Sequence, residues 1–345
     1  MAELKTSQTL AEKLKKIDML SDKINGKAGK KVMGRLSSDP ELMEKLKIQF
    51  IPTPSQNVNA AIGGGFPRGR TTVIAGLPDS GKTSLALETI GKAMKEDPNF
   101  VAGWLESENS LEIDYLTKTF GIDPDRFVYV EHEREGAGEA ALDQVESILA
   151  TGALDMMCIN SLKCLVPKEE FNKSLKDSVV GTQARMNARM MRKYTSLVDE
   201  SNAAFVIITH LSTDISSMSR DPMIISGGNA IIYGASMIID LRKRSLQEGD
   251  PISREEGIKI GLAVKKNHCI PAKNPYLKTD YYAVFGQGIE QYLEALENAV
   301  QQGILVKSGA FIKDLDKNGE PRVWNDTKLV WQGKEAFRTF MKNNP

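Results

Sequence analysis

The chain has 345 residues, 41% of them hydrophobic, which is enough for one large α/β core with small appendages at its ends. Lys and Arg together number 45, as do Asp and Glu, so binding of nucleic acid would need a local basic patch. The sequence shows no apolar run of about 18 residues and no apolar signal core, which argues against a membrane span or export and predicts a cytoplasmic protein. Cys158, Cys164 and Cys269 have no CxxC spacing, so we expect reduced thiols and no zinc site.

The N-terminal segment has the pattern of an amphipathic helix over residues 8–25. A flexible linker, NGKAGKK, is predicted to follow it. The apolar residues of the helix recur at helical spacing and are Leu10, Leu14, Ile17, Leu20 and Ile24. Residues 1–36 carry nine Lys or Arg and four acids, a net charge of +5. The helix either packs on its own domain or docks on a neighbouring subunit. Next, Ser38 and Glu41 form a predicted capping box around Pro40, which starts a short helix to about Lys47.

From Thr71 onward, short apolar runs alternate with long helical patterns. The runs are TTVIAG, VAGWLESE, LDMMCINS, AAFVIITH, SMIIDL and IGLAVKKN. This alternation predicts βαβ units and a mostly parallel, buried sheet. Ligands of such sheets bind at the carboxyl ends of the strands. The polar residues there are Gly76, Glu106, Glu108, Asn160 and His210. Past Gly288 a small α+β tail is expected, which contains Trp324 and Trp331.

The segment GLPDSGKTS fits the phosphate-binding pattern G-x-x-x-x-G-K-[ST] between a strand and a helix. Backbone N–H groups from Pro78 to Thr83 are expected to surround the β-phosphate at the helix N-terminus. Lys82 would reach the β- and γ-phosphates, and the Thr83 hydroxyl would hold magnesium. The pattern therefore predicts ATP and Mg²⁺ as cofactors, bound by Gly76, Pro78, Asp79, Ser80, Gly81, Lys82, Thr83 and Ser84.

Several separated motifs resemble the RecA family of homologous-recombination recombinases. They are FIPTPSQNVNAAIGGGFPRGRTTVIAGLPDSGKTSLAL, LDMMCINSLKCLVPKEEF, VVGTQARMNARMMRKY, SGGNAIIYGAS and GQGIEQYLEALENAVQQGILVKSGAFI. They run in order from about Lys31 to the C-terminus, and His210 after VIIT resembles the UvsX-type bacteriophage branch. The resemblance implies a RecA-like P-loop ATPase core with DNA-binding loops over residues 47–285. It also implies a subunit-docking helical arm with its linker over 1–46 and a small α+β C-terminal domain over 286–345.

The resemblance also implies roles in the reaction of ATP. Glu108 in ESEN matches the glutamate that activates the attacking water, although Glu106, two residues earlier on the same predicted strand face, remains a rival. His210 matches the γ-phosphate sensor, with a buried structural histidine as the alternative. The remaining matches concern the adenine and the neighbouring subunit's nucleotide: Tyr115, which would stack on adenine, and Lys266, His268 and Phe285, which would reach the ATP of the adjacent subunit.

DNA binding is predicted from a helix and a following loop. Arg185, Arg189 and Arg192 recur at i, i+4 and i+7, within about 60° on one helix face, which suits a row of phosphates or a solvated surface. By resemblance, Arg185 and Arg192 contact single-stranded DNA, whereas Ala188 replaces a serine contact. Residues 212–226 are expected to form a loop that DNA orders. At its end, the predicted DNA contacts are Gly227, Gly228 and Asn229.

Asn160 stands where the RecA family has the Walker B aspartate, which binds magnesium through water. An amide can accept a hydrogen bond from that water but contributes no charge. We therefore expect ATP binding and hydrolysis with weakened magnesium affinity.

The predicted function is that of a DNA-dependent ATPase that forms helical filaments on single-stranded DNA and exchanges strands with a homologous duplex. ATP would lie between subunits, with single-strand-binding and mediator proteins as candidate partners. The alternatives are a hexameric helicase of the same fold and a mediator or filament cap without turnover.

Overall fold

The computed structural model describes residues 8–29, 31–132, 138–174, 181–213, 223–248, 250–270, 276–325 and 327–344. The chain divides into two compact units, Met1–Gln49 and Phe50–Pro345, and each is described by itself. Among the described residues, no helix is both long enough and apolar enough to cross a bilayer.

The first unit contains α1 (Leu10–Ala28), which confirms the predicted helix but not its predicted end. Thr9 and Glu12 form a reciprocal capping box at its start. The prediction of a linker from Asn25 was wrong, because the helix runs on until Gly29 takes the left-handed conformation with φ 64°. Asn25 instead holds the returning chain, since its side chain bonds to the backbone of Val32 and Met33.

The second helical segment of this unit starts differently from the prediction. After the 3₁₀ turn η1 (Leu36–Ser38), Asp39 caps α2 (Pro40–Lys45) by accepting a hydrogen bond from the N–H of Leu42. The predicted cap at Ser38 was therefore wrong by one residue, because Ser38 lies inside the preceding turn.

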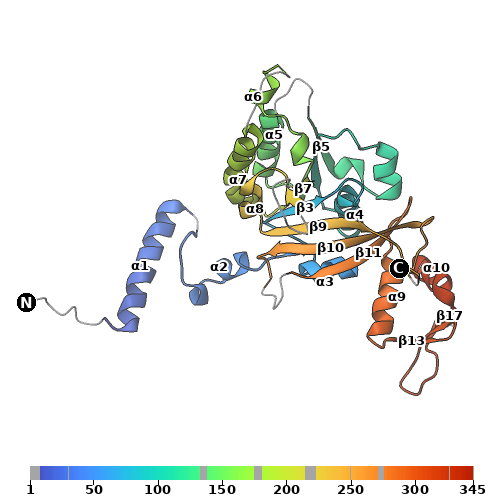
Figure 1. Cartoon of the computed structure of the whole chain (residues 1–345). Helices are drawn as coiled ribbons and strands as arrows, with labels where there is room; N and C mark the ends of the chain where they lie inside the picture. Colours follow the sequence, from blue (N-terminus) through green and yellow to red (C-terminus); the bar gives the residue numbers. More distant parts are fainter. Residues whose placement is uncertain are drawn as a thin grey trace, which may run out of the picture. The chain divides into compact units, whose positions relative to one another are not determined.

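The second unit is built on a large sheet (Figure 1). Its central strands are parallel and confirm the mostly parallel α/β fold, whereas β10, β11 and β12 run antiparallel to their neighbours. The strand order is β12 (Gly288–Ile289), β11 (Lys278–Val284), β10 (Gly257–Asn267), β9 (Met237–Arg244), β3 (Thr71–Gly76), β7 (Ala204–Thr213), β6 (Met156–Asn160), β4 (Ala102–Glu106) and β5 (Phe127–Glu131). In addition, β8 (Met223–Ile225) pairs with β7, and β1 (Phe50–Ile51) pairs with β2 (Phe66–Pro67).

The strand ends place most, but not all, of the expected polar residues. Gly76, Glu106 and Asn160 each end a strand, as predicted. His210 lies inside β7, which continues to Thr213. Glu108 lies beyond the end of β4, so the assumption that it shares a strand face with Glu106 was wrong.

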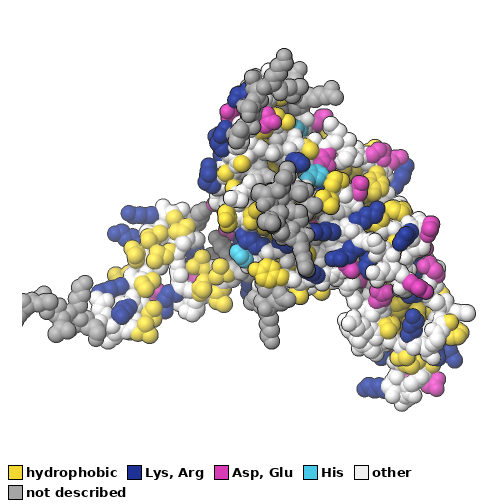
Figure 2. All heavy atoms as spheres, in the orientation of Figure 1, with side chains coloured by type: hydrophobic (Ala, Val, Ile, Leu, Met, Phe, Trp, Pro, Cys, Tyr) yellow, Lys and Arg dark blue, Asp and Glu magenta, His cyan; other side chains and the backbone are white. Residues whose placement is uncertain are grey.

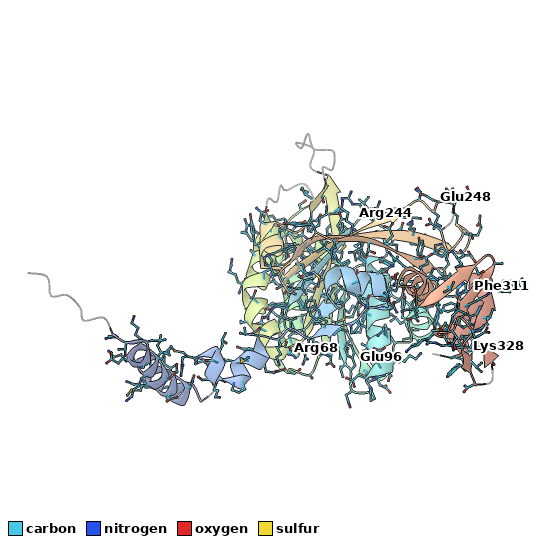
Figure 3. All side chains as sticks on the ribbon, turned by 90° about the horizontal axis from the view of Figure 1, so that it is seen from below. Arg68, Glu96, Arg244, Glu248, Phe311 and Lys328 are labelled. Atoms are coloured by element: carbon cyan, nitrogen blue, oxygen red, sulfur yellow. The ribbon has the colours of Figure 1, made fainter. Side chains whose placement is uncertain are left out.

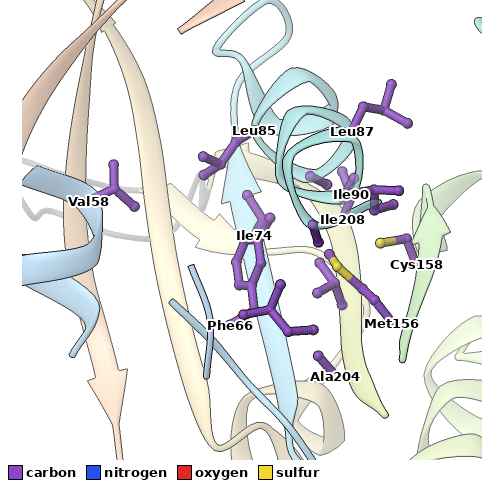
Figure 4. Packing of buried hydrophobic residues seen from close by; sticks show 14 of the residues in the cluster. Val58, Phe66, Ile74, Leu85, Leu87, Ile90, Met156, Cys158, Ala204 and Ile208 are labelled. Carbon is purple, nitrogen blue, oxygen red and sulfur yellow. The ribbon is translucent and has the colours of Figure 1, made fainter. Parts of the chain in front are cut away.

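Helices cover both faces of the sheet, and alternate residues of each strand point to opposite faces. On one face Ile74, Trp104 and Cys158 pack with α4 (Lys82–Glu96), as Figure 4 shows for Ile74, Leu85 and Cys158. On the other face, Val73 and Leu105 pack with the helices α5 (Gly138–Ala150) and α7 (Thr182–Ser201). The helices and short turns of this unit are α3 (Gln56–Ile62), η2 (Tyr115–Thr119), η3 (Pro124–Arg126), α5 (Gly138–Ala150), η4 (Leu162–Cys164), α6 (Lys168–Phe171), α7 (Thr182–Ser201) and α8 (Asn229–Gly234).

The C-terminal part has its own apolar cluster, which includes Leu293, Trp331 and Phe337. Phe311 and Lys328 mark its position in Figure 3. The cluster also takes in Val284 from β11, so the predicted domain boundary at 285 falls between residues that pack together. The elements are α9 (Gln291–Gln301), β13 (Leu305–Ser308), β14 (Phe311–Asp314), β15 (Val323–Trp324), β16 (Thr327–Lys328), β17 (Val330–Gln332) and α10 (Gly333–Asn343).

Candidate functional site

The loop between β3 and α4 has the geometry of a phosphate cradle. Gly81 caps α4 with φ 81°, a backbone conformation that glycine adopts without strain. A Cβ on Gly76 would lie 2.4 Å from Ser80 Oγ and 2.6 Å from the Leu241 carbonyl oxygen, so only glycine fits there. Lys82 Nζ donates to the Leu77 carbonyl at 2.7 Å. Burial lowers the pKa of Lys82, and the charges of Glu108 and Asp79 partly oppose that shift.

Asn160 bridges this loop to an acid on the next strand. Thr83 Oγ1 donates to Asn160 Oδ1 at 3.3 Å, and Asn160 Nδ2 donates to Glu106 Oε2 at 3.0 Å. Asn160 is fully buried and Glu106 is 1% exposed. The two residues are neighbours in register at the ends of β4 and β6. The partnership between Glu106 and Asn160 was missed by the sequence analysis, because the register of the two strands is not visible in the sequence.

The residues around Thr83 fit a magnesium ion that is shared with nucleotide phosphates. The Thr83 hydroxyl and the Asn160 amide oxygen are hard oxygen donors, which Mg²⁺ prefers in sites that keep several waters and phosphate oxygens. Within the described part of the chain, no group of three or more His, Cys, Asp or Glu side chains could hold a metal. A metal at this site would therefore depend on nucleotide phosphates and water for most of its ligands.

Glu108 and His210 form the second pair of the site. His210 Nε2 lies 2.8 Å from Glu108 Oε1, and the two side chains are 21% and 25% exposed. Burial by itself raises the pKa of Glu108, but hydrogen bonds from Ser161 and His210, with the charges of His210 and Lys82, together lower it. Glu106, by contrast, is buried and surrounded by hydrogen-bond donors. This geometry favours Glu108 over Glu106 as the residue that can approach a water molecule.

Known proteins are similar to this chain over most of its length. The family model described as the RecA N-terminal domain matches residues 15–290. The chain belongs to the RecA family. It is 32% identical over 339 residues to Protein RecA of Syntrophus aciditrophicus, which covers 98% of this chain and 91% of that protein. It is 33% identical to Protein RecA of Geobacter sulfurreducens, over 97% and 92% of the two chains, and 31% identical to that of Aquifex aeolicus, over 98% and 91%.

Four more residues were predicted from the RecA resemblance to contact a nucleotide. Tyr115 lies in η2, is 45% exposed and packs edge-on against Phe120. Lys266 pairs in register with Ile238, which itself pairs with Val73, three residues before Gly76 on β3. Its Nζ donates to the carbonyls of Ile232 and Tyr233 at 3.0 and 2.9 Å, and burial lowers its pKa. His268 follows the end of β10, and Phe285 is 59% exposed in the turn after β11.

The arginine helix of this RecA-family chain is α7. Figure 2 shows Lys and Arg side chains in a row along the edge of the core where α7 lies. Arg185 and Arg189 line the same groove as the acids Glu139, Asp143, Glu146 and Glu169. Arg185 donates to Glu169 Oε2 at 2.8 Å. Arg192 lines another hollow farther along the helix, together with Arg70 and Asp199.

The second predicted DNA segment lies partly outside the described residues. Residues 214–222 are not described, and the chain on either side of them forms the antiparallel pair β7 and β8. Gly227 and Gly228 have φ values of 112° and 88°. The Gly227 carbonyl accepts a hydrogen bond from Asn187 Nδ2 of α7 at 2.9 Å, which joins the segment to the arginine helix. Asn229 begins α8.

Proposed function

We propose that this chain forms a helical filament on single-stranded DNA and uses Glu108 to activate the water that attacks the γ-phosphate of ATP. The observation that carries the proposal is the 2.8 Å contact between Glu108 and His210 beside the phosphate loop. Neighbouring groups lower the pKa of Glu108, which favours the ionised carboxylate that a general base needs in order to accept a proton from water. Lys82, whose charge acts on Glu108, would hold the β- and γ-phosphates.

Membership of the RecA family, supported by relatives named RecA over 98% of the chain, makes the protein an ATP-dependent DNA recombinase and a DNA-dependent ATPase. The family uses ATP with Mg²⁺, and its members bind DNA and form filaments. The helicase and the mediator without turnover are therefore not favoured.

His210 would link the nucleotide to DNA. It pairs in register with Gly76, the first residue of the phosphate loop. Its backbone carbonyl accepts the N–H of Ser226 at 3.1 Å, and Thr209 Oγ1 donates to the Ser226 carbonyl at 3.2 Å. Ser226 directly precedes Gly227, at the end of the second DNA segment. A shift of His210 on contact with the γ-phosphate would therefore reach Gly227 through these hydrogen bonds.

Other residues would bind the phosphates, the adenine and the magnesium of the nucleotide. Backbone groups of residues 76–84 would surround the phosphates, and Tyr115 would stack on the adenine. When bound with the nucleotide, Mg²⁺ would offset the phosphate charge. Thr83 and Asn160 would hold it, with an affinity weakened by the missing charge of Asn160. Because Lys266 and His268 lie toward the start of β3, they would serve the ATP of an adjacent subunit, as would the exposed Phe285.

DNA would bind along α7 and the chain that follows β8. Arg185, Arg189 and Arg192 would contact phosphates, and the backbone at Gly227, Gly228 and Asn229 would approach the strand closely. A homologous duplex is the second substrate, and single-strand-binding and mediator proteins are the candidate partners. In this proposal residues 1–46 dock on a neighbouring subunit, 47–285 form the core and 286–345 form the small C-terminal domain.

We further propose that the chain belongs to the UvsX-like bacteriophage branch of the family. The supporting observation is His210 at the γ-phosphate sensor position. The protein would then act in the cytoplasm of a bacterial host, where its DNA and ATP are found.

The test is steady-state ATP hydrolysis against magnesium concentration, with and without single-stranded DNA, combined with electron microscopy of the same samples. We expect hydrolysis that DNA stimulates, a high magnesium requirement and helical filaments. Closed rings without filaments would support the helicase, and DNA and nucleotide binding without turnover would support the mediator.

A further inference from the structure

The side-chain amide of Asn160 is held through both its oxygen and its nitrogen. Its oxygen accepts a hydrogen bond from Thr83 Oγ1, and its nitrogen donates to Glu106 Oε2. We propose that Glu106 is a positioning residue that turns the oxygen of Asn160 toward Thr83 and the magnesium position, and supplies from behind the amide the negative charge that Asn160 lacks. The inference rests on the proposed binding of a magnesium nucleotide at this loop.

Glu106 is held firmly enough to do this. Its Oε2 also accepts from Trp104 Nε1 at 2.9 Å, and its Oε1 accepts from the backbone N–H of Glu108 at 2.8 Å. Every one of these partners is a donor, which suits a carboxylate, because a carboxylate is purely an acceptor. The bond to Glu108 N also joins this acid to the residue proposed as the catalytic base.

The carboxylate decides which way the amide faces. An amide has an oxygen and a nitrogen of nearly equal size, so shape alone does not set its orientation. If Asn160 were flipped, its oxygen would face Glu106 Oε2 at about 3 Å, acceptor against acceptor. Its NH₂ group would then face Thr83 and a cation. Glu106 excludes that orientation, so the amide presents an acceptor on the side where magnesium would lie.

The pair also explains why an amide suits position 160 in this chain. An aspartate there would place a second carboxylate about 3 Å from Glu106, and two carboxylates so close repel each other unless they bind a proton between them. The Glu106–Asn160 pair carries one negative charge and one hydrogen bond instead. The charge stays in the site but is moved one side chain away from the magnesium position, to Glu106.

The test compares the wild type with Glu106→Gln, Asn160→Asp and the double variant Glu106→Gln/Asn160→Asp. Glu131→Gln is the matched control, because Glu131 pairs with Glu106 in register on β5 but is exposed. Two quantities are measured for each protein. One is the Tm without nucleotide or magnesium. The other is the ratio of the Kd values of a fluorescent ADP in EDTA and in magnesium.

We expect Glu106→Gln to reduce the magnesium enhancement of ADP binding about tenfold, because a glutamine must turn an NH₂ group toward one of the surrounding donors. Asn160→Asp alone should lower the Tm by about 5 °C through repulsion between the two acids. The double variant should recover part of that Tm, since the amide introduced at position 106 can donate to the carboxylate introduced at position 160. Recovery should be incomplete, because Trp104 Nε1 loses its acceptor.

The inference is overturned if Glu106→Gln keeps the magnesium enhancement of the wild type and of Glu131→Gln. It is also overturned if the Tm losses of the two single variants simply add in the double variant. If Asn160→Asp does not fold, the magnesium enhancement of Glu106→Gln still decides. A wild type that binds no ADP at any magnesium concentration would overturn the proposed function, whereas the Tm comparison would still report on the pair.

Discussion

His210 Nε2 contacts Glu108 Oε1 at 2.8 Å, although the two residues are 102 positions apart in the sequence. The contact joins β7 to the chain just after β4, on the edge of the sheet where the phosphate loop begins. Both side chains remain partly exposed, so a water molecule can reach them.

Glu108→Gln should separate catalysis from binding. A glutamine keeps the size of the side chain but cannot take a proton, so DNA-stimulated ATP hydrolysis should fall by about 10²- to 10⁴-fold. Nucleotide affinity should change little. Hydrolysis in a coupled assay and binding of a fluorescent nucleotide measure the two effects. Glu96→Gln, an exposed acid paired with Lys92 on α4, is the control. Wild-type turnover in Glu108→Gln would remove Glu108 from the proposed mechanism.

Glu88 should make stability depend on pH. Burial raises its pKa to about 8, although the N–H of Ile289 donates to its Oε2 at 2.6 Å. Between about pH 4.5 and 8 the folded protein therefore holds a proton that the unfolded chain has released. The free energy of unfolding should fall as pH rises through this window, by about 1.4 kcal/mol per pH unit.

Glu88→Gln should remove that slope. In urea unfolding at pH 5.5, 7 and 8.5, the free energy of unfolding of the variant should therefore increase relative to that of the wild type as pH rises. Glu96→Gln on the same helix should follow the wild type. Parallel pH profiles for the wild type and Glu88→Gln would contradict the assignment of the slope to Glu88.

Arg185→Ala should weaken binding of single-stranded DNA about equally for all sequences and lower the slope of log K against log salt by about one unit or slightly less. The physical reason is the loss of one phosphate contact with its released counterion. Fluorescence anisotropy over a salt series measures it. Lys118→Ala, at an exposed pair with Asp114 away from α7, should leave the slope unchanged. An unaltered slope in Arg185→Ala would place the DNA elsewhere.

Glu169→Gln should have the opposite effect on the same assay. Its carboxylate pairs with Arg185 at 2.8 Å, so DNA has to compete with it for the guanidinium. The pair is exposed, and exposed pairs contribute little, so we expect tighter binding by only about two- to threefold. A weaker affinity would indicate that Glu169 supports the DNA site instead of opposing it.

Deletion of residues 1–30 should prevent filament assembly and leave nucleotide binding intact. The helix α1 exposes Leu10, Ile17 and Leu20 on one side, an apolar face of the kind that docks on another protein surface. Sedimentation with ATP and DNA tests assembly, and binding of fluorescent ADP is the control. Unchanged sedimentation would argue against the docking arm.

The sequence by itself determined the features that depend on neighbouring residues. The phosphate loop is nine consecutive residues, the strands β3, β6 and β7 each contain a short apolar run, and α1 follows from the spacing of its leucines and isoleucines. Local rules predicted helix ends less well. The end of α1 depends on the backbone conformation of Gly29, and Asn25 is kept helical while its side chain bonds to Val32 and Met33.

Only the tertiary structure decided which side chains of the site contact one another. Glu106 meets Asn160 because β4 and β6 pair in a particular register, and Glu108 meets His210 because β4 ends two residues before Glu108. Arg185 and Arg192 line different hollows because different elements lie beside the two ends of α7. Hydrogen bonds between residues 54 and 102 positions apart are set by the packing of the whole sheet, and no local pattern in the sequence contains that information.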